Sequence, residues 1–104
     1  MSDIIFEVLD KTGRKIRLTA KQWKHIQKHP HMHESIERIK ETINNPMTIR
    51  YDEFNDKINY FYMQYKNIEL RERYLLVSVK YLNGDGFIIT SFYTNKITGP
   101  KWKT

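Results

Sequence analysis

The sequence predicts a small α+β domain, in which an N-terminal β-hairpin and two helices pack on an antiparallel four-stranded meander. Two observations support this prediction. Helix-capping signals and helical periodicity occur between residues 20 and 44, and four runs rich in β-branched and aromatic residues follow residue 46. A length of 104 residues suits one modest hydrophobic core, so we expect a single domain over residues 1–104.

The first segment predicts a β-hairpin. The runs Ile4 to Leu9 and Lys15 to Thr19 are rich in strand-forming residues, and Gly13 lies in the turn between them.

A short helix should follow the hairpin directly. Thr19 and Gln22 have the spacing of a capping box, in which the two side chains satisfy backbone N–H groups at a helix start. The helix should begin near Ala20 and end before Pro30, because proline disfavours helical geometry in the residue that precedes it. These limits allow about two turns.

A second helix is indicated by apolar residues at helical spacing, which are Met32, Ile36, Ile39 and Ile43. They should form one buried stripe, and the polar residues between them should largely face water, namely Glu34, Arg38, Lys40 and Glu41. Pro46 stops this helix.

Four strands in succession complete the domain, over Thr48 to Phe54, Ile58 to Lys66, Tyr74 to Leu82 and Phe87 to Ile97. Compact turns at residues 55–57 and 83–86 suit hairpins, whereas residues 67–73 form a longer charged loop.

Alternation along the strands assigns their side chains to two faces. In the third of these strands it groups Leu75, Val77, Val79 and Tyr81 on one face. Ser78 and Lys80 share the other face, which can hold a phosphate. In the last strand it groups Ile88, Thr90, Phe92 and Thr94.

The charge balance favours an anionic partner. The chain has 18 Lys and Arg against 12 Asp and Glu, a net charge of +6, which attracts nucleic acid without distinguishing RNA from DNA. The absence of cysteine excludes disulfides and thiolate nucleophiles. We expect a soluble cytoplasmic protein with no membrane association, because no apolar run approaches the roughly 20 residues of a membrane span.

His25 and His29 are the leading catalytic candidates. They lie four residues apart in a Lys-rich segment, and helical geometry groups them with Lys21 and Lys28. An imidazole titrates near pH 6.5, so one ring can accept a proton while another donates one. RNA cleavage without a metal needs such a base and acid, with cations around the phosphate. The alternative is that both are ordinary surface histidines.

A metal site is the weaker interpretation of the four histidines. The segment lacks the Glu of a His-Glu-x-x-His motif, and Pro30 interrupts the geometry that would join His25 and His29 to His31 and His33. We therefore expect neither a metal nor another cofactor.

Further residues suit contact with nucleic acid. A base can stack on Tyr62, and cations are available at Arg50, Lys80, Arg71 and Arg73. Core packing of the tyrosine and ordinary solvation of the charges are the alternatives.

A family resemblance joins several of these motifs, which are Trp23-x-His25, His29-Pro30, Asn45-Pro46, Tyr60-Phe61-Tyr62, Val77-Ser78-Val79 and Ile89-Thr90-Ser91-Phe92. Together they resemble a phage-type Barnase-EndoU-colicin-RelE (BECR) nuclease domain over roughly residues 20 to 97.

The resemblance implies a BECR/RelE-like α+β fold and a metal-independent endoribonuclease, often a toxin or conflict-system effector with an antitoxin or immunity protein as partner. His25, His29 and Thr90 match its motif positions. Met47 and Phe92 depart from it, since an acidic residue and a tyrosine are common there; Tyr93 or Tyr62 can substitute for the lost hydroxyl. The departure leaves open an inactive RNA-binding or protein-interaction module of the same fold.

Overall fold

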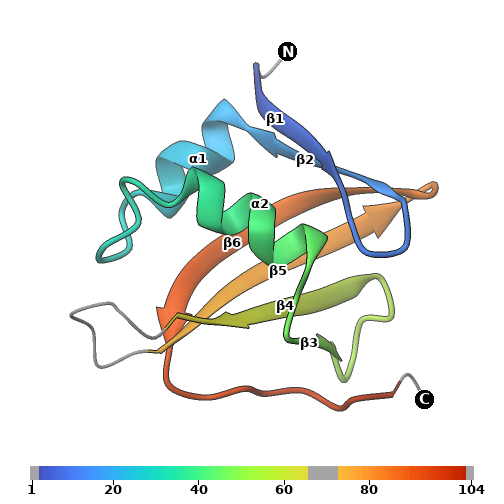
Figure 1. Cartoon of the computed structure of the whole chain (residues 1–104). Coiled ribbons are helices and arrows are strands. Elements are labelled where there is room, and N and C mark those ends of the chain that lie inside the picture. The colour runs from blue at the N-terminus through green and yellow to red at the C-terminus, as the bar shows by residue number, and fades with distance from the viewer. Residues whose placement is uncertain (1–2, 66–72, 103–104) are drawn as a thin grey trace.

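The computed structural model describes residues 3–65 and 73–102. Its elements are, in order, β1 (Ile4–Leu9), β2 (Lys15–Thr19), α1 (Ala20–Ile26), α2 (Ile36–Asn44), β3 (Thr48–Tyr51), β4 (Ile58–Gln64), β5 (Tyr74–Leu82) and β6 (Asp85–Thr94). The α+β class and the order of the elements are as predicted. Figure 1 shows the two helices packed over a twisted sheet.

The sheet has six strands rather than four, in the order β1-β2-β6-β5-β4-β3. The hairpin β1–β2 does not pack on a separate meander; it extends the sheet, because β2 pairs in parallel with β6 through Ile16 to Gly86 and Arg17 to Phe87. The four strands predicted after the helices do form an antiparallel meander, β3-β4-β5-β6. The prediction was wrong in the strand number of the sheet and in packing the hairpin on the meander as a separate unit. The sequence pattern located the strands but did not indicate which strand edges meet.

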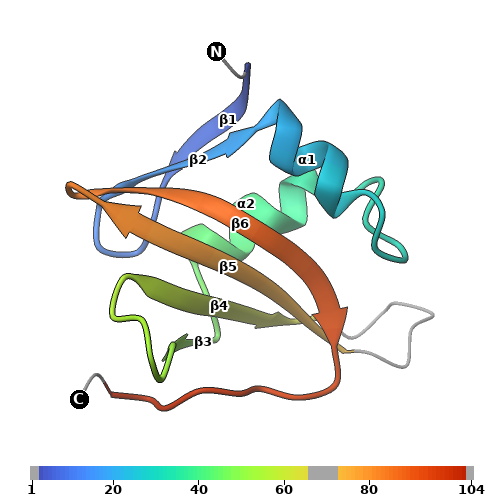
Figure 2. The same ribbon diagram turned by 180° about the vertical axis from the view of Figure 1, so that it is seen from behind.

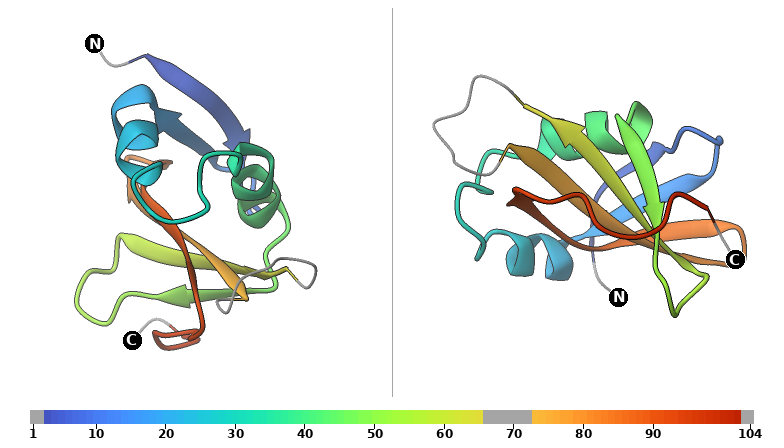
Figure 3. Two further views of the ribbon diagram at one scale, coloured as in Figure 1. Left: turned by 90° about the vertical axis from the view of Figure 1, so that its left-hand side faces the viewer. Right: turned by 90° about the horizontal axis from the view of Figure 1, so that it is seen from below.

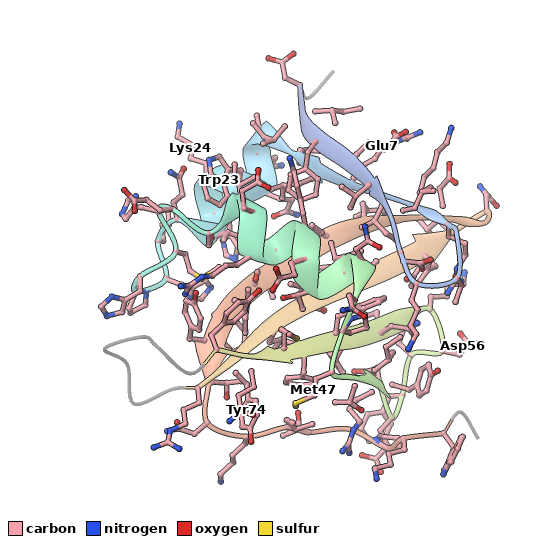
Figure 4. All side chains as sticks on the ribbon, in the orientation of Figure 1. Glu7, Trp23, Lys24, Met47, Asp56 and Tyr74 are labelled. Atoms are coloured by element: carbon pink, nitrogen blue, oxygen red, sulfur yellow. The ribbon has the colours of Figure 1, made fainter. Side chains whose placement is uncertain are left out.

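The predicted start of α1 and the Thr19 half of its capping box are confirmed, since the Thr19 hydroxyl accepts a hydrogen bond from the Gln22 backbone N–H at 3.3 Å. The helix ends at Ile26, and residues 27–30 continue as turns that carry the chain to Pro30. Trp23 packs against the core, while Lys24 points away from the body of the domain (Figure 4).

The apolar stripe of α2 is also observed, with Ile39 and Ile43 fully buried. Met32 is buried too, but it precedes the helix, whose N-cap is Ser35. Arg38 does not face water as expected. It is half-buried, because its guanidinium donates a hydrogen bond to the Tyr93 hydroxyl at 2.9 Å.

The core lies between the helices and one face of the sheet. As predicted, Leu75, Val77, Val79 and Tyr81 point into it from β5, together with Phe61 of β4. We call the other side the outer face. Cross-strand partners share a face, so the pairings Thr90–Ser78–Tyr60 and Phe92–Leu76–Tyr62 place these six side chains on the outer face.

A β-bulge in β6 breaks the predicted alternation. Ser78 pairs with Thr90 but the next residue, Val79, pairs with Ile88, which leaves Ile89 as the extra residue. Ile88 therefore faces the core, fully buried, whereas Thr90 and Phe92 face outward. Grouping Ile88 with Thr90 was wrong because an extra residue inverts the alternation.

The first strand after the helices is shorter than predicted, since β3 ends at Tyr51 rather than at Phe54. The Asp52 carboxylate accepts hydrogen bonds from the Phe54 and Asn55 backbone N–H groups, and the Tyr60 hydroxyl donates to it as well. This local turn ends the strand. Likewise β6 ends at Thr94, not at Ile97; the predicted end of the second strand, Lys66, lies outside the described residues.

The segment after β6 crosses the outer face (Figure 3). Thr98 donates its backbone N–H to the Tyr62 hydroxyl at 3.2 Å, and the Tyr51 N–H donates to the Pro100 carbonyl at 3.0 Å. The Arg50 guanidinium donates to the Gly99 carbonyl at 3.1 Å. This crossing covers part of the outer face near β3 and β4. Within residues 3–65 and 73–102, no helix is long and apolar enough to cross a membrane.

A buried carboxylate fixes the β1–β2 turn to the sheet. Asp10 accepts hydrogen bonds from the Thr12 and Arg14 backbone and, at 2.6 Å, from the Tyr81 hydroxyl. Burial opposes its ionisation, but the hydrogen bonds, led by that of Tyr81, outweigh burial and hold the pKa of Asp10 below its ordinary value of 3.8. The same burial and the neighbouring carboxylate raise the pKa of Tyr81.

Gly86→Ala should destabilise the junction of β2 and β6. A Cβ at this position would lie 2.7 Å from Ile16 Cδ1 and 2.9 Å from Val79 Cγ1, both in the packed core. We expect the free energy of unfolding to fall by about 1–3 kcal/mol, and further for Gly86→Val, as measured by urea denaturation. An unchanged midpoint for both variants would contradict the packing described here.

Asp10 should make stability depend on pH in the acid range. Because its folded pKa lies below the unfolded value of 3.8, the unfolded chain binds more protons, and the contribution is present above that value and lost as pH falls through the folded pKa. Asp10→Asn should therefore flatten the plot of unfolding free energy against pH below about pH 5. The exposed substitution Glu53→Gln is the control and should leave the slope unchanged.

Candidate active site

The position of α1 beside β6 creates the site. β2 pairs with β6 only as far as Phe87, and the chain turns directly from Thr19 into α1. Along the rest of β6, the described residues place no strand on that edge, and α1 packs there instead (Figure 2). The end of α1 is thereby held against the second half of β6.

His25 and His29 meet at this edge, as their spacing predicted. Their ring centroids lie 5.7 Å apart with the ring planes nearly perpendicular. His25 is exposed on the last turn of α1, and His29 is half-buried in the turn that follows. Backbone hydrogen bonds from Lys28 to His25 and from His29 to Ile26 keep that turn compact enough for the rings to meet.

His29 also contacts two residues of β6. Its Nε2 lies 3.5 Å from the Thr90 hydroxyl oxygen, and its ring centroid lies 5.3 Å from that of Phe92. The bulge at Ile89 is responsible for this contact, because it turns Thr90 and Phe92 together toward the outer face. The structure thus brings His25, His29 and Thr90 together, although the sequence separates Thr90 from His29 by 61 positions.

A pocket adjoins His29. It has a volume of about 230 Å³ and is lined by His29, Pro30, His31, Phe92 and Tyr93. Phe92 and Tyr93 are neighbours in a strand, so their side chains diverge and the pocket lies at the strand edge. His31 has a φ of 65°, a left-handed conformation that is uncommon for a residue other than glycine.

Three of the predicted cations lie on the same elements or the same face as these groups. Lys21 and Lys28 are exposed on the α1 segment that carries the histidines. Lys80 is half-buried and, two positions after Ser78, belongs to the same outer face as Thr90. Lys80 therefore adds positive charge to the sheet face that carries Thr90, and Lys21 and Lys28 add it to the segment that carries the histidines.

Tyr62 is not the exposed stacking residue that the sequence analysis predicted. It is 1% exposed, and its hydroxyl is hydrogen-bonded to Thr98. The Arg50 guanidinium donates one hydrogen bond to the Gly99 carbonyl. The prediction for Tyr62 was wrong because the crossing of the outer face by the C-terminal segment was not apparent from strand patterns, whereas a nucleic-acid contact of Arg50 stays a prediction.

Within the described residues, the other two predicted arginines have no recorded contact with the histidines. Arg73 is exposed just before β5, where its carbonyl accepts the Tyr65 N–H at 2.9 Å. Arg71 lies outside the described residues, as does most of the predicted charged loop at residues 67–73.

The sequence analysis did not predict that Arg38 contacts a residue of the pocket. Arg38 holds the hydroxyl of Tyr93, a pocket residue, and its guanidinium lies 4.6 Å from the Tyr65 ring centroid. No local spacing signals this contact, since 55 positions separate Arg38 from Tyr93. The suggested replacements for the hydroxyl absent from Phe92 are both engaged elsewhere, Tyr93 with Arg38 and Tyr62 with Thr98.

The remaining sequence expectations concern Met47 and metal ligands. Met47 is exposed on the side of β4 where the C-terminal segment runs, away from α1 (Figure 4). Among the described residues, no three His, Cys, Asp or Glu side chains cluster in a way that could hold a metal ion.

Fold and site together define a small α+β domain with two imidazoles and a hydroxyl at the edge of its sheet. The sequence model of the family described as phage-Barnase-EndoU-ColicinE5/D-RelE like nuclease2 matches residues 5–103. The chain belongs to this BECR-like nuclease family, which confirms the resemblance inferred from its motifs. Comparison with curated proteins and with solved structures gives no significant match.

The ring contacts of His29 predict a specific NMR signature. Phe92→Leu should shift the ring-proton resonances of His29, because it removes an aromatic ring whose centroid lies 5.3 Å away. The resonances of His33, which is exposed and outside this cluster, should stay in place and serve as the control. Unchanged His29 resonances in a folded variant would contradict the geometry of the site.

Proposed function

We propose that this chain is a metal-independent endoribonuclease that cleaves RNA by general acid–base transesterification. One observation carries the proposal: within a nuclease family member, His29 lies between the ring of His25 and the hydroxyl of Thr90. These three groups are close enough to act on a single phosphodiester.

The reaction needs one base and one acid. The base removes the proton of the ribose 2′-hydroxyl, and the 2′-oxygen attacks the adjacent phosphorus. The bond from phosphorus to the 5′-oxygen of the next nucleotide then breaks, and the acid protonates that oxygen. The products are a 2′,3′-cyclic phosphate and a 5′-hydroxyl. His25 and His29 share these roles, because imidazole titrates near neutral pH.

Positioning and charge come from neighbouring residues. The Thr90 hydroxyl, 3.5 Å from His29 Nε2, is suited to orient a phosphate oxygen beside that ring. Lys21, Lys28 and Lys80 supply positive charge that stabilises the phosphorane as negative charge develops on it. Arg50 has no part in this assignment, since it binds the Gly99 carbonyl.

An inactive RNA-binding module is the second candidate, and Phe92 is the observation that favours it. A phenyl ring, with no proton to donate, lies against His29, at the position where the family resemblance implies a tyrosine. Such a module would bind RNA with a strong dependence on salt and leave it uncut.

An acidic inhibitor is the protein partner that suits this function. The net charge of +6 and the exposed Lys21 and Lys28 would attract an antitoxin or immunity protein with a negative surface.

Cleavage of a labelled mixed-sequence RNA in EDTA tests the function. The purified protein should yield 2′,3′-cyclic phosphate ends, and His29→Ala should lower kcat/KM by at least about 100-fold, because a positioned acid or base contributes about 10²–10⁴-fold. His33→Ala, a histidine outside the cluster, should stay within about twofold of the parent protein.

The outcomes separate the candidates. Full activity of a folded His29→Ala variant would refute the catalytic assignment. RNA binding that weakens steeply with salt, with no cleavage by any variant, would favour the binding module instead.

A further inference from the structure

The pocket beside His29 has no role in the acid–base chemistry described above. Its walls come from the turn after α1, through Pro30 and His31, and from the end of β6, through Phe92 and Tyr93. His29 belongs to both the pocket and the proposed catalytic group, so whatever occupies the pocket lies next to the reacting phosphate.

The pocket is suited to a flat ring rather than to a large ligand. Its volume of about 230 Å³ is below the roughly 300–1,000 Å³ typical of sites for drug-sized molecules. Two aromatic side chains, two imidazoles and a proline surround it, and no carboxylate is among the residues that line it. An electron-rich base can therefore stack there without repulsion between the adjoining phosphate and the walls.

The walls are held in place before any ligand binds. The hydroxyl of Tyr93 accepts a hydrogen bond of 2.9 Å from Arg38, which in turn lies over the ring of Tyr65. Phe92 packs against His29 at a ring tilt of 42°. A preformed wall reduces the entropy lost on binding.

His31 contributes an imidazole to the pocket, and its backbone adopts an energetically unfavourable conformation. Its φ of 65° lies in the left-handed region, which residues other than glycine occupy at some expense in free energy. The conformation lets the chain turn back after Pro30 and brings His31 to the pocket. An imidazole at that point can hydrogen-bond to the edge of a stacked base.

We propose that this pocket binds the nucleobase next to the scissile phosphate and sets the sequence preference of cleavage, an inference that rests on the proposed ribonuclease function. Phe92, on the outer face beside His29, provides the stacking surface, as aromatic side chains do for unpaired RNA bases, and Tyr93 lines the pocket at the strand edge. His31 reads the edge of the base.

Binding can be tested without catalysis. The probes are adenosine, guanosine, cytidine and uridine, with ribose and inorganic phosphate as separate arms, each titrated into the labelled protein and followed by NMR. At least one nucleoside should shift the resonances of His31, Phe92 and Tyr93 saturably, while ribose and phosphate should not. Shifts caused by phosphate alone, or by no nucleoside, would overturn the proposal.

Matched variants assign the effect to the pocket. His31→Asn should weaken binding of the preferred nucleoside by about 5- to 10-fold, within the range expected for the loss of one hydrogen bond, because asparagine tolerates the left-handed conformation but removes the imidazole. Phe92→Leu should weaken it as well, since it removes a stacking ring. His33→Asn is the control and should bind like the parent protein; equal binding by all three variants would refute the assignment.

The titration tests the pocket and the cleavage assay tests the ribonuclease function, so either proposal can be contradicted without the other. Nucleoside binding in a protein that cuts no RNA would support the pocket and count against the ribonuclease. In an active enzyme, His31→Asn should change the ratio of kcat/KM between dinucleotide substrates that differ in one base. An unchanged ratio would contradict base recognition by the pocket and leave the ribonuclease proposal intact.

Discussion

The short parallel pairing of β2 with β6 is the constraint on which the site depends. It extends over only two residue pairs, and Gly86 permits it because Ile16 and Val79 occupy the space that a Cβ would need. β2 ends immediately afterwards at Thr19, whose hydroxyl caps α1. The helix therefore occupies the strand edge that a longer β2 would have covered, and His29, in the turn that follows the helix, lies against β6.

The bulge in β6 is the second requirement. Without the extra residue, the side chains after Ile88 would keep their simple alternation, and Thr90 would share the core face with Ile88. With it, Ile88 stays buried, while Thr90 and Phe92 turn outward to meet His29. Bulges often occur next to active sites because they redirect side chains in this way. The bulge thus lets one strand supply both a core residue and two residues that contact His29.

Local patterns predicted much of the fold because they report local physics. The Thr19 cap, the stripe of α2 and the inward face of β5 depend on hydrogen bonds or alternation within a few residues. The spacing of His25 and His29 likewise predicted their proximity. Contacts between distant segments left no such signal. The parallel pairing of β2, the burial of Tyr62 by the Thr98 segment and the bond from Arg38 to Tyr93 each depend on the assembled sheet.

The central claim is that His25 and His29 act as a unit on one phosphodiester. A double-mutant cycle on kcat/KM for RNA cleavage, with folding of each variant verified, tests it most directly. The effects of substituting residues that share one chemical step do not add in activation free energy. The double alanine variant should therefore lose about as much activity as the more damaging single variant. Single losses that multiply in the double variant would contradict the claim and indicate two independent roles.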